Sequence, residues 1–129
     1  MTRDINKTDV DIIHKDVVEE VIKKMPDENM FLNLADTFKL IGDNTRCKIL
    51  YALNEKEMCV GDIANILDMT KSSISHQLAT LRRSGIVRCR KEGKEVLYKL
   101  DDEHITKLFE VAVEHILHRE SLGGSYYES

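Results

Sequence analysis

The sequence predicts a mainly α-helical fold with one small β-hairpin. Apolar residues recur at helical spacing through most of the 129-residue chain, and the period changes only between residues 86 and 100, where short, partly β-branched runs flank a glycine. With 42% apolar residues, a chain of this length can bury one core of ordinary size. A single proline and six glycines exclude collagen-like and Pro/Gly-rich disordered chains.

The composition also indicates the cellular compartment in which the protein is expected. No apolar run approaches the roughly 18 residues that a membrane span needs, so no membrane partner is expected. The N-terminal residues (MTRDINKTDVDIIHKD) are too polar for a secretion signal. Three widely spaced cysteines, an odd number, argue against a disulfide framework and for a reducing environment. We therefore expect a cytoplasmic protein.

The first two helices are expected over residues 9–24 and 28–41. In each stretch the apolar residues fall on one face of a helix, and Pro26 separates the two stretches. The apolar stripes of the first and the last helix exceed what one small core needs. Residues 1–26 are therefore expected to form an N-terminal arm with a dimerisation helix.

Three short helices are expected next, over residues 45–53, 60–67 and 71–84. Asp43 or Asn44 can cap the first of them, because a short polar side chain accepts a hydrogen bond from the free N–H groups of a first helical turn. Residues 68–70 form a tight turn, and Thr70 is a natural N-cap for the third helix. Two helices joined in this way predict a helix-turn-helix.

The last elements are expected to be strands over residues 86–91 and 95–100 and a helix over residues 102–119. The Glu92-Gly93 pair predicts a hairpin turn between the strands. The order of helices, helix-turn-helix, hairpin and final helix is that of a winged helix-turn-helix, which we assign to residues 27–120. Residues 121–129 (SLGGSYYES) are expected to be a disordered tail.

Charge is unevenly distributed along the chain, whose net charge is −4. Residues 70–99 contain eight Lys and Arg, Lys71 among them, against two Glu, so this segment carries +6 and the other 99 residues carry −10. A basic block on an acidic body is typical of a surface that faces nucleic-acid phosphates, although a solvated charged face gives the same pattern.

The helix over residues 71–84 has two different faces. Ile74, Leu78 and Leu81 fall on one stripe at about 100° per residue and are expected in the core. The opposite face is small, polar and cationic, and it consists of Ser72, His76, Ala79 and Arg83, with Ser73 beside them. Such a face suits base edges in a major groove, and the cations of the hairpin tip, Arg90 and Lys94, suit backbone phosphates. We therefore predict binding to double-stranded operator DNA, against the alternative of an ordinary amphipathic helix.

The last helix carries Asp102-x-His104 followed by His115-x-x-His118. His115 and His118 share a helix face and can chelate one ion. The two pairs lie about 16 Å apart along the helix, which one ion with ligand bonds of about 2 Å cannot bridge. Two such helices crossing antiparallel about a twofold axis bring the first pair of one chain against the second pair of the other. The spacing thus predicts a homodimer with two four-ligand sites for Zn²⁺, with Co²⁺ as a substitute.

The chain resembles the ArsR/SmtB family of metal-sensing bacterial repressors over residues 28–120. The resemblance runs through LADTFKLIGDNTRCKILYAL, MCVGDIANIL, SSISHQL, RKEGKEVLYKL and DDEHITKLFEVAVEHILHRE. The last segment is similar to the zinc-sensing branch, because Asp102, His104, His115 and His118 fill all four of its ligand positions. The resemblance implies a metal-free dimer that binds an inverted-repeat operator and leaves it when zinc binds, which releases genes for metal efflux or sequestration.

The resemblance also implies roles for residues near the DNA. Ser75, His76 and Gln77 match the positions with which the family reads bases. The free N–H of His115, when the ring binds metal, is implied to reach a backbone carbonyl near Gly85.

A second type of metal site in the family joins thiolates of the segment around Cys59 to N-terminal cysteines of the partner chain. This sequence keeps Cys59 and Asp62 but has Gly61 between them, and no cysteine precedes Cys47. A thiolate-rich site that selects cadmium or lead is therefore not expected. Cys59, Asp62 and His14 remain as a candidate secondary site.

Other functions are also compatible with the sequence. A thiol redox-sensing repressor on the same fold would pair Cys59 with Cys47 or Cys89, and a sensor of cadmium, cobalt or nickel would use the same scaffold with another ion. Zinc could also be purely structural at the dimer interface. An enzyme is not expected, because four ligands close the coordination shell of the ion and no HExxH motif is present.

Overall fold

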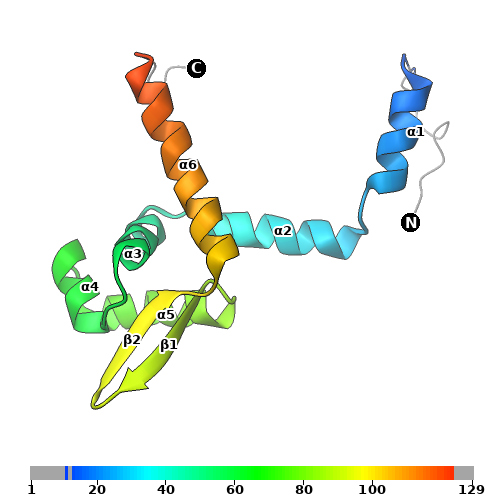
Figure 1. The fold of residues 1–129 in the computed structure, drawn as a ribbon. Helices are drawn as coiled ribbons and strands as arrows, with labels where there is room; N and C mark the ends of the chain where they lie inside the picture. The colour runs from blue at the N-terminus through cyan, green and yellow to red at the C-terminus, as the bar shows by residue number, and fades with distance from the viewer. Residues whose placement is uncertain (1–10, 12, 124–129) are drawn as a thin grey trace. The chain divides into compact units, whose positions relative to one another are not determined.

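The computed structural model describes residue 11 and residues 13–123 (Figure 1). The chain divides into two compact units, residues 1–39 and residues 40–129. Among the helices of residues 13–123, none combines the length and the apolar character that a membrane crossing requires.

The first unit contains α1 (Lys15–Lys24) and most of α2 (Glu28–Ile41), which is continuous across the boundary between the units. The expected range of α2 is confirmed, but α1 begins later than residue 9. Among the described residues before Lys15, the His14 side chain caps no helix end and the Ile13 side chain is 85% exposed, so neither of these two side chains stabilises an earlier helical turn. Residues 9, 10 and 12 of the expected helix lie outside the described residues.

The second unit begins with α3 (Asn44–Glu55), α4 (Val60–Leu67) and α5 (Lys71–Arg83). The two expected N-caps are confirmed: the Asp43 carboxylate accepts from the backbone N–H of Arg46, and the Thr70 hydroxyl accepts from that of Ser73. Asp68 ends α4 in the left-handed region at φ 55°, which Asp tolerates better than most residues. The chain can therefore turn sharply between α4 and α5.

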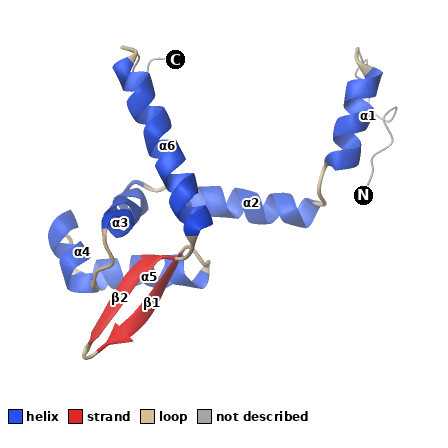
Figure 2. Ribbon diagram, viewed as in Figure 1, coloured by secondary structure: helices blue, strands red, loops and turns tan. Residues whose placement is uncertain are grey.

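The wing is the antiparallel hairpin of β1 (Val87–Glu92) and β2 (Glu95–Leu100), drawn in red in Figure 2. Gly93 has φ 62° at the first position of the two-residue turn, a conformation that glycine adopts without strain. On its other edge, β2 pairs with Met58 through two backbone hydrogen bonds to Tyr98. The wing is thereby attached to the linker between α3 and α4.

The last helix, α6 (Glu103–Ser121), follows the wing directly. The Asp102 carboxylate caps it by accepting from the backbone N–H of Ile105 at 3.1 Å. The helix runs two residues further than expected, and its C-terminal turn is closed by Leu122 and Gly123. Of the expected tail, residues 124–129 lie outside the described residues.

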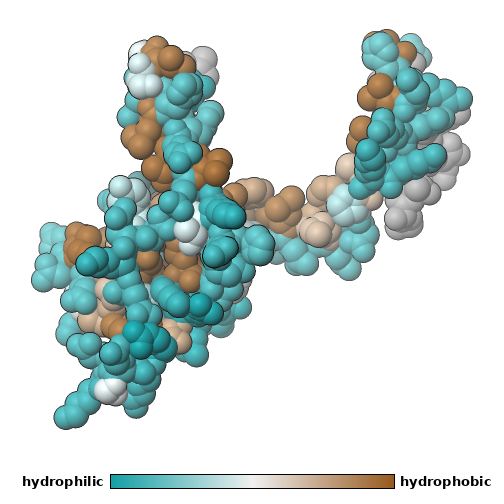
Figure 3. Space-filling view, in the orientation of Figure 1, coloured by the Kyte–Doolittle hydropathy of each residue, from teal (hydrophilic) through white to brown (hydrophobic). Residues whose placement is uncertain are grey.

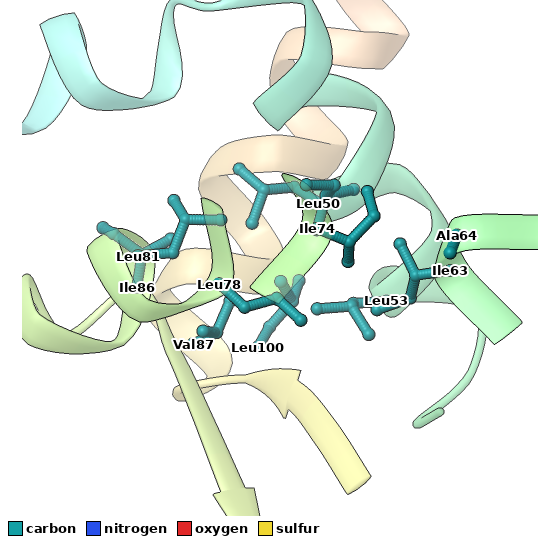
Figure 4. Close-up of a cluster of buried hydrophobic side chains, with 11 residues drawn as sticks. Leu50, Leu53, Ile63, Ala64, Ile74, Leu78, Leu81, Ile86, Val87 and Leu100 are labelled. Atoms are coloured by element: carbon teal, nitrogen blue, oxygen red, sulfur yellow. The ribbon is translucent and has the colours of Figure 1, made fainter. Parts of the chain in front are cut away.

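The core of the second unit is a cluster of aliphatic side chains between the helix-turn-helix and the base of the wing (Figure 4). Ile74, Leu78 and Leu81 are fully buried, as their stripe on α5 predicted. They pack in one cluster with residues from α3, α4 and both strands, among them Leu50, Ile63, Val87 and Leu100. This packing fixes α5 so that its polar face points away from the core.

We expect Thr70→Ala to lower the free energy of unfolding by about 1 kcal/mol, because the backbone N–H of Ser73 loses its acceptor. Thr70→Ser, which keeps a hydroxyl at the same position, is the matched control and should retain most of the stability. Urea denaturation at a fixed protein concentration measures both. Equal stability of the alanine and serine variants would show that this cap contributes nothing.

Candidate nucleic-acid interface and metal site

The outer face of α5 is available to a nucleic acid. Of the residues predicted to contact DNA on this helix, most are exposed: Lys71, Ser72, Ser75, His76 and Arg83. Ser73 is half-buried, and its backbone N–H is bound by the Thr70 cap. The helix thus presents hydroxyls, an imidazole and cations on one side and the core stripe on the other, which is the division that major-groove reading requires.

Gln77 differs from its neighbours on α5. Its side chain is half-buried, and its carbonyl oxygen accepts a hydrogen bond of 2.9 Å from the Nε–H of Arg46 on α3. Arg46 in turn donates to the backbone carbonyl of Leu40 at 3.4 Å. Position 77 lies beside the core stripe, so its side chain meets α3. Base reading by Gln77 stays a prediction. The spacing of residues in the sequence could not reveal its contact with Arg46, which is 31 residues away.

The wing carries the two predicted phosphate contacts, Arg90 and Lys94. Lys94 is exposed at the hairpin turn. The Arg90 guanidinium instead forms a two-point ion pair with Glu57, with Nε–Oε2 3.0 Å and Nη2–Oε1 2.8 Å. Its Nη2 also lies 2.8 Å from Oε2 of Glu92. Sequence analysis missed Glu57, because nothing in the spacing of residues 57 and 90 indicates their contact.

This contact shifts the ionisation of both partners. The hydrogen bond from Arg90 holds the pKa of the Glu57 carboxyl below its usual range, and the charges of Arg90, Lys99 and Arg88 act in the same direction. Donating this hydrogen bond to Glu57 likewise raises the pKa of Arg90, which stays cationic in any case. Both groups are therefore charged at neutral pH, and the pair is an ion pair.

The first half of the predicted metal site lies at the start of α6. Asp102 Oδ2 is 3.4 Å from Nδ1 of His104, and both side chains are well exposed. The backbone N–H of Ile105 and the hydrogen bond with His104 lower the pKa of Asp102, so its carboxylate is ionised. These two side chains are close enough to act as neighbouring ligands of one ion.

The second half, His115 and His118, lies on the exposed surface of α6 three residues apart. Because α6 is continuous from Glu103 to Ser121, the 11-residue separation of His104 and His115 corresponds to about 16 Å. Within the described part of the chain, no three His, Cys, Asp or Glu side chains gather closely enough to hold a metal ion. One chain therefore brings together each half of the predicted site but does not unite the halves.

The carbonyl contact implied for His115 is not seen. Across residues 13–123, no hydrogen bond joins the His115 ring to residues 83–86, and Gly85 donates its backbone N–H to the carbonyl of Arg82. The contact was implied for the metal-bound protein, and for that state it stays a prediction.

Two members of the candidate secondary site, Cys59 and Asp62, lie next to each other. The Cys59 thiol donates to Oδ2 of Asp62 at 3.2 Å, while His14 belongs to the other compact unit. At Gly61 a Cβ atom would lie 3.9 Å from the Cys59 sulfur and 3.4 Å from Cε of Lys71. A side chain would fit there without severe overlap, but glycine supplies no second thiolate.

The other two cysteines, Cys47 and Cys89, are both partly buried. Cys47 is half-buried, and its thiol donates to the backbone carbonyl of Ile41 at 3.1 Å. Burial and the charge of Asp43 raise the pKa of this thiol, which makes it less reactive. Cys89 is half-buried on β1, and all three cysteines are free thiols.

Comparison with known proteins agrees with this architecture. Residues 43–88 match the family described as "Bacterial regulatory protein, arsR family". The chain is 42% identical over 124 residues to a cadmium resistance transcriptional regulatory protein CadC homolog of Staphylococcus aureus, which covers 95% of this chain and 100% of that protein. It is 30% identical over 108 residues to a transcriptional repressor SmtB homolog of Synechocystis, with 84% of this chain and 82% of that protein covered.

A solved structure shows the same fold. The homodimeric winged helix-turn-helix DNA-binding domain Mb0332 of Mycobacterium bovis superimposes with a TM-score of 0.64 at 26% identity, covering 81% of this chain and 97% of that one. The relatives are transcriptional regulators, and the expectation that the chain is not an enzyme is confirmed. From its exposed recognition helix, its wing and these similarities, the chain belongs to the ArsR/SmtB family of metal-sensing transcriptional repressors.

Proposed function

We propose that this protein is a zinc-responsive repressor whose metal-free homodimer binds an inverted-repeat operator in the cytoplasm and leaves it when zinc binds. The observation that carries the proposal is the set of four exposed potential ligands at the start and along the outer surface of α6: Asp102, His104, His115 and His118. Release from the operator would derepress genes for metal efflux or sequestration.

A homodimer is supported by apolar side chains that the single chain leaves exposed. On α6 they include Val111 at 63% and Leu117 at 59% exposure, and Figure 3 shows apolar side chains along this helix. On α1, Val17 and Val21 are each about half exposed. Helices with such stripes gain stability by pairing, and Mb0332 is homodimeric. An antiparallel α6 pair would bring together the two halves of the metal site.

The donor set fits zinc. Three imidazoles and one carboxylate, without a thiolate, suit a tetrahedral Zn²⁺ site, and Co²⁺ accepts the same ligands. Bound zinc would supply a link between the α6 helices of the two protomers, each of which contributes one pair of ligands. Closure of the shell by four protein ligands leaves no open position for catalysis.

A cadmium-responsive repressor is the second candidate, and the 42% identity to the CadC homolog of Staphylococcus aureus favours it. Cadmium prefers thiolates, and the Cys59 segment offers only one, because residue 61 is glycine. Nickel or cobalt sensing and thiol redox sensing by Cys59 remain alternatives on the same fold.

Operator binding with and without metal tests the proposal. Duplex DNA selected by the metal-free protein is titrated in buffers that contain Zn²⁺, Co²⁺, Cd²⁺ or Ni²⁺. We expect zinc to weaken binding by at least about fivefold, the lower end of ordinary allosteric coupling. A response to cadmium alone supports the second candidate, and unchanged affinity with zinc bound indicates a structural ion. A variant with all three cysteines replaced by serine should keep the zinc response, whereas a thiol redox sensor would lose its response.

His76→Ala should lower operator affinity more than affinity for random DNA, because His76 faces outward on the recognition helix. The expected loss in discrimination is about 1–3 kcal/mol per base contact. Lys94→Ala is the comparison variant: loss of a phosphate contact should weaken all sequences alike and reduce the salt slope by about one. Equal losses on operator and random DNA for His76→Ala would contradict base reading by this residue.

A further inference from the structure

The Glu57 carboxylate binds Arg90, the arginine of the wing that is predicted to contact DNA. Arg90 donates to both oxygens of Glu57 through Nε and Nη2, and Nη2 also meets Glu92. In this arrangement one guanidinium faces two carboxylates, so the three groups together carry a charge of −1. A DNA phosphate would be repelled by such a cluster unless one carboxylate moves away.

The contact crosses the wing. Met58 pairs with Tyr98 on the edge of β2 that is remote from β1, whereas Arg90 lies on β1 opposite Leu97. The Arg90 side chain therefore reaches across β2 to Glu57 on the face of the hairpin that is turned away from the core. On the same strand, Val87 is buried on the core side. Arg88, the next residue, is exposed on this outer face.

The Glu57–Arg90 ion pair is exposed enough for Arg90 to exchange the carboxylate for another anion. The Arg90 side chain is 52% exposed and that of Glu57 is 25% exposed. Ion pairs at such positions contribute little to stability, because water and salt screen them. A phosphate offers the guanidinium the same two-point geometry as a carboxylate, with more negative charge in the surrounding duplex.

We propose that Glu57 competes with DNA for Arg90: the carboxylate holds the guanidinium in the DNA-free protein, and a backbone phosphate displaces it when the wing docks. The proposal rests on the phosphate contact that the sequence predicts for Arg90 as part of the proposed DNA interface. Glu57 thereby lowers affinity for every DNA sequence alike, since the contact it opposes reads no base.

Glu57→Gln tests the competition on random duplex DNA with metal-free protein. We expect affinity to rise about two- to fivefold, the range that corresponds to losing one exposed ion pair. Glu95→Gln is the matched control: Glu95 lies opposite Glu92 at the tip, is exposed, and makes no ion pair within the described structure. It removes the same charge from the wing without releasing Arg90, and its effect should be smaller.

The same two substitutions, made in a protein that also carries Arg90→Met, distinguish competition for Arg90 from general charge repulsion. Under the proposal, the gain from Glu57→Gln beyond that of Glu95→Gln disappears, because no guanidinium is left to release. Equal gains from both substitutions, or a gain that persists without Arg90, would indicate general charge repulsion and overturn the proposal. A loss of affinity in Glu57→Gln would overturn it too, since Glu57 would then position the wing.

Arg90→Met alone tests whether Arg90 contacts a DNA phosphate at all. It should weaken binding to random DNA and reduce the salt slope by about one. If affinity and slope stay unchanged, Arg90 makes no phosphate contact, and that part of the proposed DNA interface is wrong independently of what Glu57 does.

Discussion

Replacing His104 by alanine is expected to reduce zinc affinity by more than about 100-fold and to remove zinc-driven release from the operator. Loss of hydrogen-bonding partners behind metal ligands already costs about 10- to 100-fold in affinity, and loss of a ligand itself should cost more. Competition with a chelator of known affinity measures the first effect, and operator binding at saturating zinc measures the second. His76→Ala is the matched control for the chelator measurement, because His76 is also exposed but belongs to neither candidate metal site.

Mixed dimers show whether the site is shared between chains. One chain carries Asp102→Ala and His104→Ala, and the other carries His115→Ala and His118→Ala. Each homodimer lacks half of every site, whereas the mixed dimer contains one complete site and one with no ligands. We expect tight zinc binding at one ion per mixed dimer and none in either homodimer. Failure of the mixed dimer to recover binding would rule out a site between the two α6 helices.

Leu78→Ala is expected to lower the free energy of unfolding by about 2–5 kcal/mol. Leu78 is fully buried on α5 within the cluster that joins the helix-turn-helix to the wing, so the smaller side chain leaves a cavity. Because most domains are stable by only about 5–15 kcal/mol, such a loss should also weaken DNA binding at moderate temperature.

Denaturation in urea at fixed protein concentration measures this effect, since a dimer's stability depends on concentration. Ser72→Ala is the matched control on the same helix: its side chain is exposed, and its effect should stay within about 0.5 kcal/mol. A loss below about 1 kcal/mol for Leu78→Ala would show that α5 is not anchored through this side chain.

Local features of the fold were predictable because their causes lie within a few residues. The N-caps Asp43 and Thr70 act on N–H groups three positions away, and the hairpin turn depends on one glycine with positive φ. The stripe of Ile74, Leu78 and Leu81 follows from helical periodicity alone. Sequence also suffices to list the four potential metal ligands, because their spacing along one helix is fixed at about 1.5 Å per residue.

Tertiary structure decided what depends on residues far apart in the chain. The contact of Arg90 with Glu57, 33 positions away, changes the state of the wing arginine, and the contact of Arg46 with Gln77 turns a predicted reading residue toward α3. The start of α1 also needed the structure, because a periodic stripe without a cap or packing does not specify where a helix begins. Periodicity indicates on which face of a helix or strand a side chain lies. The residue that this side chain contacts is set by the packing of segments far apart in the chain, which no local pattern encodes.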